Sequence, residues 1–424
     1  MLSTLDALMH SLTSILGPDR LTADPAALDS CLIDGRKPRL VVAPQTAEQV
    51  AATLRVCSEA RATMVPRGGG TALALGNPPR RVDVVIKLHG LDRIVEHDSA
   101  NLTVSAQCGI SVKALQSALA AQNQFVPIDA PLPQRTTVGG VVAANLNGPR
   151  RAGYGSVRDL VVGMKVVLAN GEQIKAGGKV VKNVAGYDMC KLFVGSLGTL
   201  GIITEVTLRV APIAGTTATL VGSGNLTRVE DFYRRLLRSV LTPAAAFIAR
   251  DGAAERWRIG VWCDGFADSV ERQLGDLREM AARSGLSGDL LSAEKQYEFW
   301  DPVRDFPLAT GRLIYRVMVP PAELFGFVKL VEGWHDVAIA CDAATGTIWL
   351  ACAAHTSGLQ RFSYLAATAR ERRGHAVIFA APAALKTGVN VWGASAPSFS
   401  LMREIKRQFD PDALLNPGRF AGNL

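Results

Sequence analysis

The chain has 424 residues, 48% of them hydrophobic, which is enough apolar material for a large core divided over two or three domains. Its net charge of +8 arises from 46 Lys and Arg residues against 38 Asp and Glu, without a long run of one sign. Nothing in this pattern predicts a nucleic-acid-binding arm. The 7 cysteines form no CxxC pair, which excludes a zinc or iron–sulfur framework within this chain and is typical of reduced thiols inside a cell.

Residues 1–17 are apolar but do not have the pattern of an export signal. Leu and other apolar residues recur at steps of three and four, Asp6 interrupts them, and no basic segment precedes them. The pattern predicts an amphipathic helix that ends at Gly17 and Pro18. Elsewhere no run approaches the roughly 18 apolar residues of a spanning helix. We therefore expect a cytoplasmic protein, which would reach a membrane through a partner.

The first half of the chain alternates strands and helices. "RLVVAP" predicts a strand, Thr46 and Gln49 a capping box for the next helix, and "TMVPRGGG" a second strand. The same order returns in "LTVSAQCG", in a helix opened by Ser111, and in "FVPID". This alternation indicates an α/β or α+β domain.

The stretch "PRGGGT" at 66–71 places three adjacent glycines directly after a predicted strand. Glycines in this number cost backbone entropy, so the backbone here must be free of side chains. The GxGxxG and GxxxxGK[ST] loops do not occur, so neither a Rossmann site nor a P-loop is predicted. A structural turn, a flexible link and an anion-binding loop of backbone N–H groups remain open.

Further glycine clusters follow along the chain. Gly139 and Gly140 precede small residues, Gly153 and Gly155 flank Tyr154, and 195–201 carries three more glycines before a strand. The glycines at 68–70 and at 139–140 lie about seventy residues apart. Two segments that expose backbone in this way could hold one long ligand between them.

Three further features organise the rest of the chain. "LVVGMKVVLANGEQIKAG" predicts a hairpin about Asn170-Gly171, since both residues tolerate positive φ. After Pro212 longer strands and helices alternate, which predicts an open sheet with helices on one face. Near the end, a helix stops at Asp410-Pro411 and a tail could fold back onto the first half. We expect four parts: 1–34, 35–212, 213–400 and 401–424.

The motifs "PRGGGTALALGN", "TTVGGVVAANLNGPRRAGYGSVRD", "GSLGTLGIITEVTLRVAP" and "LLNPGRF", taken together and in order, resemble the vanillyl-alcohol-oxidase-type, or p-cresol-methylhydroxylase (PCMH)-type, FAD flavoproteins. The likeness is strongest to the FAD-binding E subunits of glycolate oxidases, the GlcE group. The resemblance implies an α+β fold: a PCMH-type FAD-binding domain of two α/β subdomains at 35–212, then a smaller ferredoxin-like open-sheet cap at 213–400. Residues 1–34 would be the helical lead-in, and 401–424 would return to the FAD domain.

The resemblance also implies the residues that bind FAD. The segment 66–71 would wrap the pyrophosphate through main-chain N–H groups, which a diphosphate needs at close range. The adenine would meet the backbone of Ile203. The flavin is expected to be noncovalent, because no His occurs between Gly68 and Gly76. The implied cofactor-binding residues are Pro66, Arg67, Gly68, Gly69, Gly70, Thr71, Thr137, Gly139, Gly140, Ala143, Gly153, Tyr154, Gly155 and Ile203.

This sequence differs from the catalytic D-type relatives in two features that bear on function. Catalytic D-type relatives carry an HxGDGNxH substrate site and read GSEGTLG, whereas this chain has no such histidine site and has Leu197 in "GSLGTLG". The resemblance thus implies an FAD-binding subunit of a glycolate-oxidase-like complex, in which a 2-hydroxy acid loses a hydride to flavin. A D-type flavoprotein subunit and an iron–sulfur subunit would be its partners. A self-contained FAD dehydrogenase of a hydroxy acid or alcohol and a non-enzymatic flavin-fold scaffold remain as alternatives, and no catalytic residue is assigned.

Several residues near these motifs also have simpler interpretations. Arg150 and Arg151 are expected as a solvated surface pair rather than a docking site, and Tyr154 could pack in a core. The polar residues of "KVVKN", Lys179, Lys182 and Asn183, could cap a loop as well as touch a substrate. Asp188 is expected to bond nearby backbone.

Overall fold

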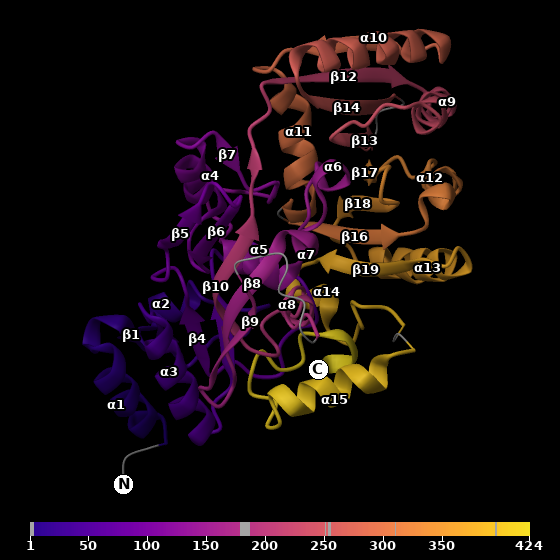
Figure 1. Ribbon diagram of the computed structural model, residues 1–424. Helices are drawn as coiled ribbons and strands as arrows, with labels where there is room; N and C mark the ends of the chain where they lie inside the picture. Colours follow the sequence, from indigo (N-terminus) through magenta and orange to yellow (C-terminus); the bar gives the residue numbers. More distant parts are fainter. Residues whose placement is uncertain (1–3, 179–186, 251, 253–255, 310, 395–396) are drawn as a thin grey trace.

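The computed structural model describes residues 4–178, 187–250, 252, 256–309, 311–394 and 397–424. Within these residues the strands form four sheets, of four, five, two and eight strands. The two sheets of four and five strands lie in the first half of the chain, and the eight-stranded sheet stands beside them (Figure 1). This arrangement is the α+β class that the sequence predicts.

The first glycine loop follows an edge strand of the four-stranded sheet. The order of this sheet is β1-β2-β4-β3, with β2 (Leu40–Val42), β4 (Val84–Lys87) and β3 (Met64–Arg67) parallel and β1 (Leu21–Thr22) antiparallel at the edge. Helix α3 (Ala47–Glu59) links β2 to β3, and its N-cap Thr46 accepts a hydrogen bond from the Gln49 amide as predicted. The glycines follow the carboxyl end of β3, where parallel strands commonly carry ligands.

The amphipathic N-terminal helix is confirmed as α1 (Thr4–Leu16). Leu8, Leu12 and Leu16 are buried, and the helix packs on α3. Gly17 ends it with φ +85°, a conformation that favours glycine. Residues 4–17 are therefore part of the fold, with one face of the helix in the core.

The five-stranded sheet is antiparallel and has the order β5-β6-β10-β8-β9. Its strands are β5 (Ile94–Asp98), β6 (Thr103–Gln107), β10 (Ile202–Arg209), β8 (Val161–Val167) and β9 (Gln173–Gly177). The helices of this part are α4 (Val112–Ala120), capped by Ser111 as expected, α5 (Val138–Ala144), α6 (Arg151–Tyr154), α7 (Val157–Leu160) and α8 (Cys190–Phe193). The strand expected in "FVPID" is only the two-residue β7 (Gln124–Phe125), paired with β11 (Ala211–Pro212).

The predicted hairpin at Asn170-Gly171 exists, but its turn differs from the expected one. Leu168 accepts from the Gly171 amide and donates to Glu172, and only Gly171 has a positive φ, +82°. Gly171 alone is therefore in the left-handed region, whereas the expected two-residue turn has both residues at positive φ.

The eight-stranded sheet consists of two βαββαβ units joined edge to edge. The first unit is β12 (Thr216–Gly224), α9 (Leu226–Leu237), β13 (Ala245–Arg250), β14 (Trp257–Gly265), α10 (Ala267–Arg283) and β15 (Ser287–Leu291). The second is β16 (Arg312–Met318), α12 (Leu324–Val331), β17 (Ala338–Asp342), β18 (Thr347–Ala353), α13 (Ser357–Glu371) and β19 (His375–Ala380). The first unit has the strand order β15-β12-β14-β13, and the second has the equivalent strands in reverse order, β17-β18-β16-β19. The two units are joined by the pairing of β13 with β17. The ferredoxin-like pattern is thus present twice.

The two faces of this sheet have different neighbours. Helices α9, α10, α12 and α13 cover one face and share its hydrophobic core. The other face packs on helix α11 (Gln296–Asp305) and, through residues such as Ile314, Trp349 and Phe379, on the core of the first half. A face of the sheet is thereby placed against the segments that carry the glycine clusters.

The C-terminal tail lies on the four-stranded sheet. Helix α15 (Phe399–Phe409) precedes Asp410, and Leu415 forms an isolated parallel bridge with Met64 of β3. The Asn416 amide donates to the Met64 carbonyl at 2.8 Å. Residues near the end of the chain therefore lie beside β3, the strand that leads into the first glycine loop.

Candidate functional site

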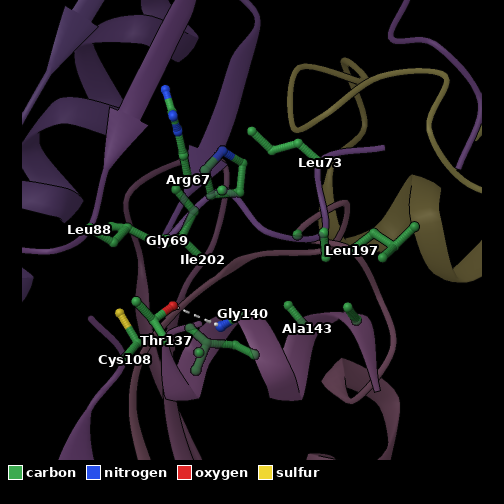
Figure 2. A pocket seen from close by; sticks show the side chains of 18 of the residues that line it. Arg67, Gly69, Leu73, Leu88, Cys108, Thr137, Gly140, Ala143, Leu197 and Ile202 are labelled. Atoms are coloured by element: carbon green, nitrogen blue, oxygen red, sulfur yellow. Dashed lines mark hydrogen bonds between the residues drawn. The ribbon is translucent and has the colours of Figure 1, made fainter. Parts of the chain in front are cut away.

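A cavity of about 800 Å³ lies where the three glycine-rich segments meet. It is lined by most of the residues that the sequence points to: Pro66, Arg67, Gly68, Gly69, Gly70, Thr71, Thr137, Gly139, Gly140, Ala143 and Ile203. Segments separated by up to 137 positions therefore form one site, as Figure 2 shows.

Two of the loop glycines are required by contacts inside the protein. A Cβ at Gly68 would lie 2.1 Å from Thr137 Oγ1, and one at Gly69 would lie 1.6 Å from the Arg135 carbonyl oxygen. Gly139 is similarly placed against Cys108, at 2.6 Å. Because glycine has no side chain, the segments can pack closely together at these positions. This packing places the backbone of the loop at the wall of the cavity.

The backbone of the 66–71 loop presents donors that the protein itself does not use. In the described part of the chain, no hydrogen bond is donated by the amides of Gly69, Gly70 or Thr71. Gly70 has φ +74°, which turns the chain at this point. Successive free N–H groups in such a turn form a concavity suited to an anion such as a pyrophosphate.

The Arg67 side chain does not point into the cavity. Its Nη1 donates to the Ser30 carbonyl at 2.9 Å and to Cys31 Sγ at 3.0 Å. In Figure 2 it extends away from Thr137 and Gly140. Arg67 would therefore contribute to a bound diphosphate through its main chain, as the family resemblance implies.

Helix α5 forms another wall. Thr137 is its N-cap and accepts a hydrogen bond from the Gly140 amide at 3.3 Å (Figure 2). Thr136, its neighbour, bonds to the Thr71 hydroxyl at 3.0 Å, so the loop and the helix are tied together. Ala143 faces the cavity further along α5. Small side chains along this helix leave space for a planar ring.

The third wall contains Leu197. Leu197 has φ +55°, its amide donates to the Ala143 carbonyl at 2.8 Å, and its side chain lines the cavity. Gly198 and Ile202 follow on the same wall. This wall of the cavity is therefore apolar in this chain.

Several lining residues were not among the predicted site residues: Ala72, Leu73, Leu75, Leu88, Cys108, Ala144, Leu197, Gly198, Gly201, Ile202, Asn416 and Arg419. Asn416 donates to the Leu197 carbonyl at 2.7 Å, and its Oδ1 is buried without a partner among the described residues. Such an atom fits a site that is completed by a polar ligand. The "LLNPGRF" motif was the sequence signal for Asn416 and Arg419, but its contact with the loop depends on the tertiary fold.

Gly153, Tyr154 and Gly155 do not line this cavity. The Gly153 amide donates to Ala244, and the Tyr154 hydroxyl donates to Asp264 Oδ2 at 2.7 Å, so both residues contact the eight-stranded sheet. Tyr154 also packs edge-on against Phe125. Gly153 and Tyr154 thus contact the second half of the chain, and a cofactor-binding role for these three residues stays a prediction.

The expectation that Arg150 is a solvated surface residue is wrong. Its guanidinium pairs with Asp129 at 2.5 Å, with both side chains less than one-fifth exposed, and lies 4.8 Å from the Trp262 ring centroid. Asp188 bonds the Cys190 amide, as expected. Lys179, Lys182 and Asn183 lie outside the described residues.

A second cavity, of about 490 Å³, lies between the segment after α5 and the eight-stranded sheet. Asn145, Asn147 and Arg151 line it from the first half of the chain, and Arg316 and Asp342 from the sheet. Burial raises the pKa of the Asp342 carboxyl to about 6, although the Thr345 hydroxyl and the Arg151 charge oppose the shift. Burial, with the Arg151 charge, lowers the pKa of Arg316 to about 10.

The described residues contain no helix with the length and apolar character needed to cross a membrane. They also contain no group of three or more His, Cys, Asp or Glu side chains placed to hold a metal ion.

The chain is similar to known flavoproteins. A family model described as an FAD binding domain matches residues 38–177. Glycolate oxidase subunit GlcD of Bacillus subtilis (strain 168) is 28% identical over 90% of this chain and 88% of its own length. Glycolate oxidase subunit GlcE of Escherichia coli (strain K12) is 28% identical over 85% and 93%. D-2-hydroxyglutarate dehydrogenase of Xanthomonas citri pv. viticola is 27% identical over 94% of both.

Solved structures share the fold. 4-Ethylphenol oxidase from Gulosibacter chungangensis superposes with a TM-score of 0.77, at 15% identity, over 99% of this chain and 97% of its own. p-Cresol methylhydroxylase superposes with a TM-score of 0.74, at 15% identity, over the same shares. The fold is thus that of the PCMH-type flavoproteins. Residues 38–177 match the FAD binding domain model, the cofactor is FAD, and the chain is an FAD-dependent oxidoreductase.

Proposed function

We propose that this chain is the FAD-binding, E-type subunit of a glycolate-oxidase-like complex that oxidises a 2-hydroxy acid, with glycolate to glyoxylate as the reaction. Bound FAD would accept a hydride from the α-carbon, and the electrons would pass to an iron–sulfur partner. The observation that carries the proposal is the cavity of unused amides and small residues, which the glycine-rich segments form together. The FAD would be held noncovalently by 66–71, Thr137, Gly139, Gly140, Ala143 and Ile203.

The assignment to the E-type rather than the D-type subunit rests on two positions in the sequence. The HxGDGNxH site of D-type relatives is missing, and Leu197 stands where those relatives carry a glutamate. Leu197 lines the FAD cavity, so the substitution removes a carboxylate from that wall. Such a change would alter the charge around a bound flavin, and nearby charges are one means by which proteins tune the electronic properties of a flavin.

A self-contained FAD dehydrogenase is the second candidate. It is favoured by the similarity to D-2-hydroxyglutarate dehydrogenase along 94% of both chains. In that case the chain would oxidise its substrate without an iron–sulfur or D-type partner, and would pass its electrons directly to an acceptor.

The two candidates can be separated by anaerobic flavin reduction. The purified full-length chain is loaded with FAD, and glycolate, D-lactate or D-2-hydroxyglutarate is added while flavin absorbance is followed. The same assay is repeated with D-type and iron–sulfur partner proteins present. Bleaching only in the assembled complex supports the subunit. Bleaching of the chain alone overturns the subunit assignment in favour of the dehydrogenase, and failure to take up FAD would leave only a scaffold.

A further inference from the structure

A third cavity, of about 620 Å³, lies at the amino ends of the parallel strands in the four-stranded sheet. Strands β2, β3 and β4 begin in register there, since Leu40 and Met64 both pair with Val84. The glycine loop follows the opposite, carboxyl end of β3, so this cavity is separate from the FAD cavity. Three arginines that shortly precede the strands line it: Arg39, Arg61 and Arg81.

A single carboxylate lies beside two of these arginines. Arg81 Nε is 2.6 Å from Asp83 Oδ2, and Arg39 Nη1 is 3.9 Å from Asp83 Oδ1. Asp83 Oδ2 also accepts hydrogen bonds from the Thr63 amide and hydroxyl, each at 2.8 Å. One anion, already bonded by Thr63, is therefore shared between two guanidinium groups and does not neutralise both.

The guanidinium donors of Arg39 and Arg61 are largely unused by the protein. In the described part of the chain, the Arg39 side chain donates no hydrogen bond. Arg61 Nη1 donates to Asp412 Oδ1 at 3.2 Å, but both side chains are exposed, and such surface pairs contribute little. The three arginines and Asp83 carry a net charge of +2 when ionised, of which +1 remains when Asp412 is counted. Positive charge concentrated in a cavity attracts anions.

The rest of the cavity wall is apolar. Leu5 and Leu8 lie one turn apart on α1, so both face the same side of the helix and line the cavity. Ala60 and Ala62, from the turn between α3 and β3, complete this wall. A bare inorganic anion would leave these side chains in water. An anion that carries a hydrocarbon chain would displace that water favourably.

We infer that the third cavity binds a phosphate group attached to an apolar chain, with Arg39 and Arg61 holding the phosphate and Leu5 and Leu8 contacting the chain. Guanidinium groups bind phosphate oxygens in paired hydrogen bonds. A phosphate has more acceptor oxygens than a carboxylate, so it can be bound by arginines from several strands. This chemistry is shared by a free alkyl phosphate and by an anionic phospholipid in a membrane surface.

The test measures binding of octyl phosphate to the full-length chain by isothermal titration calorimetry. The chain is loaded with FAD, so that the 66–71 loop is occupied. Octyl phosphate should bind more tightly than inorganic phosphate, because only octyl phosphate covers the apolar wall. Arg39→Gln should weaken octyl phosphate about tenfold through loss of charge-assisted hydrogen bonds, and Arg61→Gln should weaken it similarly. Arg55→Gln, an exposed position on α3 outside the cavity with the same change of charge, is the matched control and should change nothing.

The apolar wall and the source of the phosphate need two further measurements. Leu5→Ala should reduce the advantage of octyl phosphate over inorganic phosphate. Sedimentation with phosphatidylglycerol vesicles, and with phosphatidylcholine vesicles as the control, tests the membrane source. Arg39-dependent binding to phosphatidylglycerol alone would assign an anionic lipid, whereas binding of octyl phosphate without either vesicle would assign a soluble amphiphile.

Three results would overturn the inference. They are equal affinities of inorganic and octyl phosphate for the wild type, unchanged affinity for octyl phosphate in folded Arg39→Gln and Arg61→Gln variants, and absence of binding to both octyl phosphate and phosphatidylglycerol vesicles. Urea unfolding of each variant shows that it is folded. Arg39 donates no side-chain hydrogen bond within the described residues, so its replacement should leave the stability of the chain unchanged.

Discussion

Lys386 Nζ lies 2.6 Å from Asp34 Oδ1, and the two side chains are only 1% and 5% exposed. Arg419 donates to the other oxygen of the same carboxylate. Lys386 also donates to the carbonyls of Ala74 and Gly76, at 2.8 and 3.2 Å. A buried cluster of one anion and two cations thus joins the N-terminal lead-in, helix α14 (Ala383–Lys386) and the C-terminal tail to the chain that follows the glycine loop.

Asp34→Ala should be strongly destabilising. The change leaves Lys386 and Arg419 buried without their anion, a situation that commonly costs on the order of 3 kcal/mol or more. Urea unfolding should show a loss of this size, and FAD should dissociate more readily because residues 72–77 lose their support. The control is Asp29→Ala, which breaks the exposed pair with Lys37 and should cost less than about 1 kcal/mol. Equal losses in both variants would contradict the role of the cluster.

Gly69→Ala should disrupt the FAD site even though it adds only a methyl group. The new Cβ would lie 1.6 Å from the Arg135 carbonyl oxygen, so the loop must move away from the 135–137 segment. FAD content after purification, measured by absorbance, should fall sharply. Gly275→Ala in helix α10 is the matched control, since nothing lies within 4 Å of its Cβ, and it should stabilise the chain by roughly 0.5–1 kcal/mol. Normal FAD content in Gly69→Ala would refute the packing argument.

Cys108 should not attach the flavin covalently. Its side chain lines the FAD cavity, but burial raises the pKa of the thiol to about 12, and the nucleophilic thiolate is therefore disfavoured. Denaturing the wild type should release all of its FAD into the supernatant, and Cys108→Ser should release the same fraction. Flavin that stays with the denatured wild-type chain but not with the variant would show a covalent bond.

Asp342→Asn should raise stability at neutral pH. The folded pKa of about 6 lies above the ordinary value, so the ionised carboxylate destabilises the fold above pH 6 and the penalty disappears as pH falls toward 4. The variant should unfold in urea with a gain on the order of 2 kcal/mol at pH 8. The difference from wild type should shrink between pH 6 and pH 4. A variant that is less stable than wild type at pH 8 would contradict a buried, unpaired carboxylate.

The accuracy of the sequence predictions depended on how local each feature is. The α1 helix, the capping of α3 by Thr46 and of α4 by Ser111, and the glycine loop after β3 were predicted correctly, since each depends on neighbouring residues. The solvated interpretation of Arg150 failed, because its partners Asp129 and Trp262 are distant in sequence. The duplication of the βαββαβ unit was also missed, since two open sheets and one continuous sheet have the same local pattern.

The sequence by itself determined the cofactor segments, because glycines, small residues and their order along the chain are local properties that a packed FAD site cannot do without. Only the tertiary structure decided why Gly68 and Gly69 must be glycines, since the atoms they would strike belong to residues 135–137. It also decided that Tyr154 contacts Asp264 rather than the cavity, and that Arg316 of β16 and Asp342 of β17, two strands separated by β18, line one cavity. Hydrogen bonds and ion pairs between distant residues form only when the sheets pack together and bury them. The periodicity of the sequence therefore does not predict these contacts.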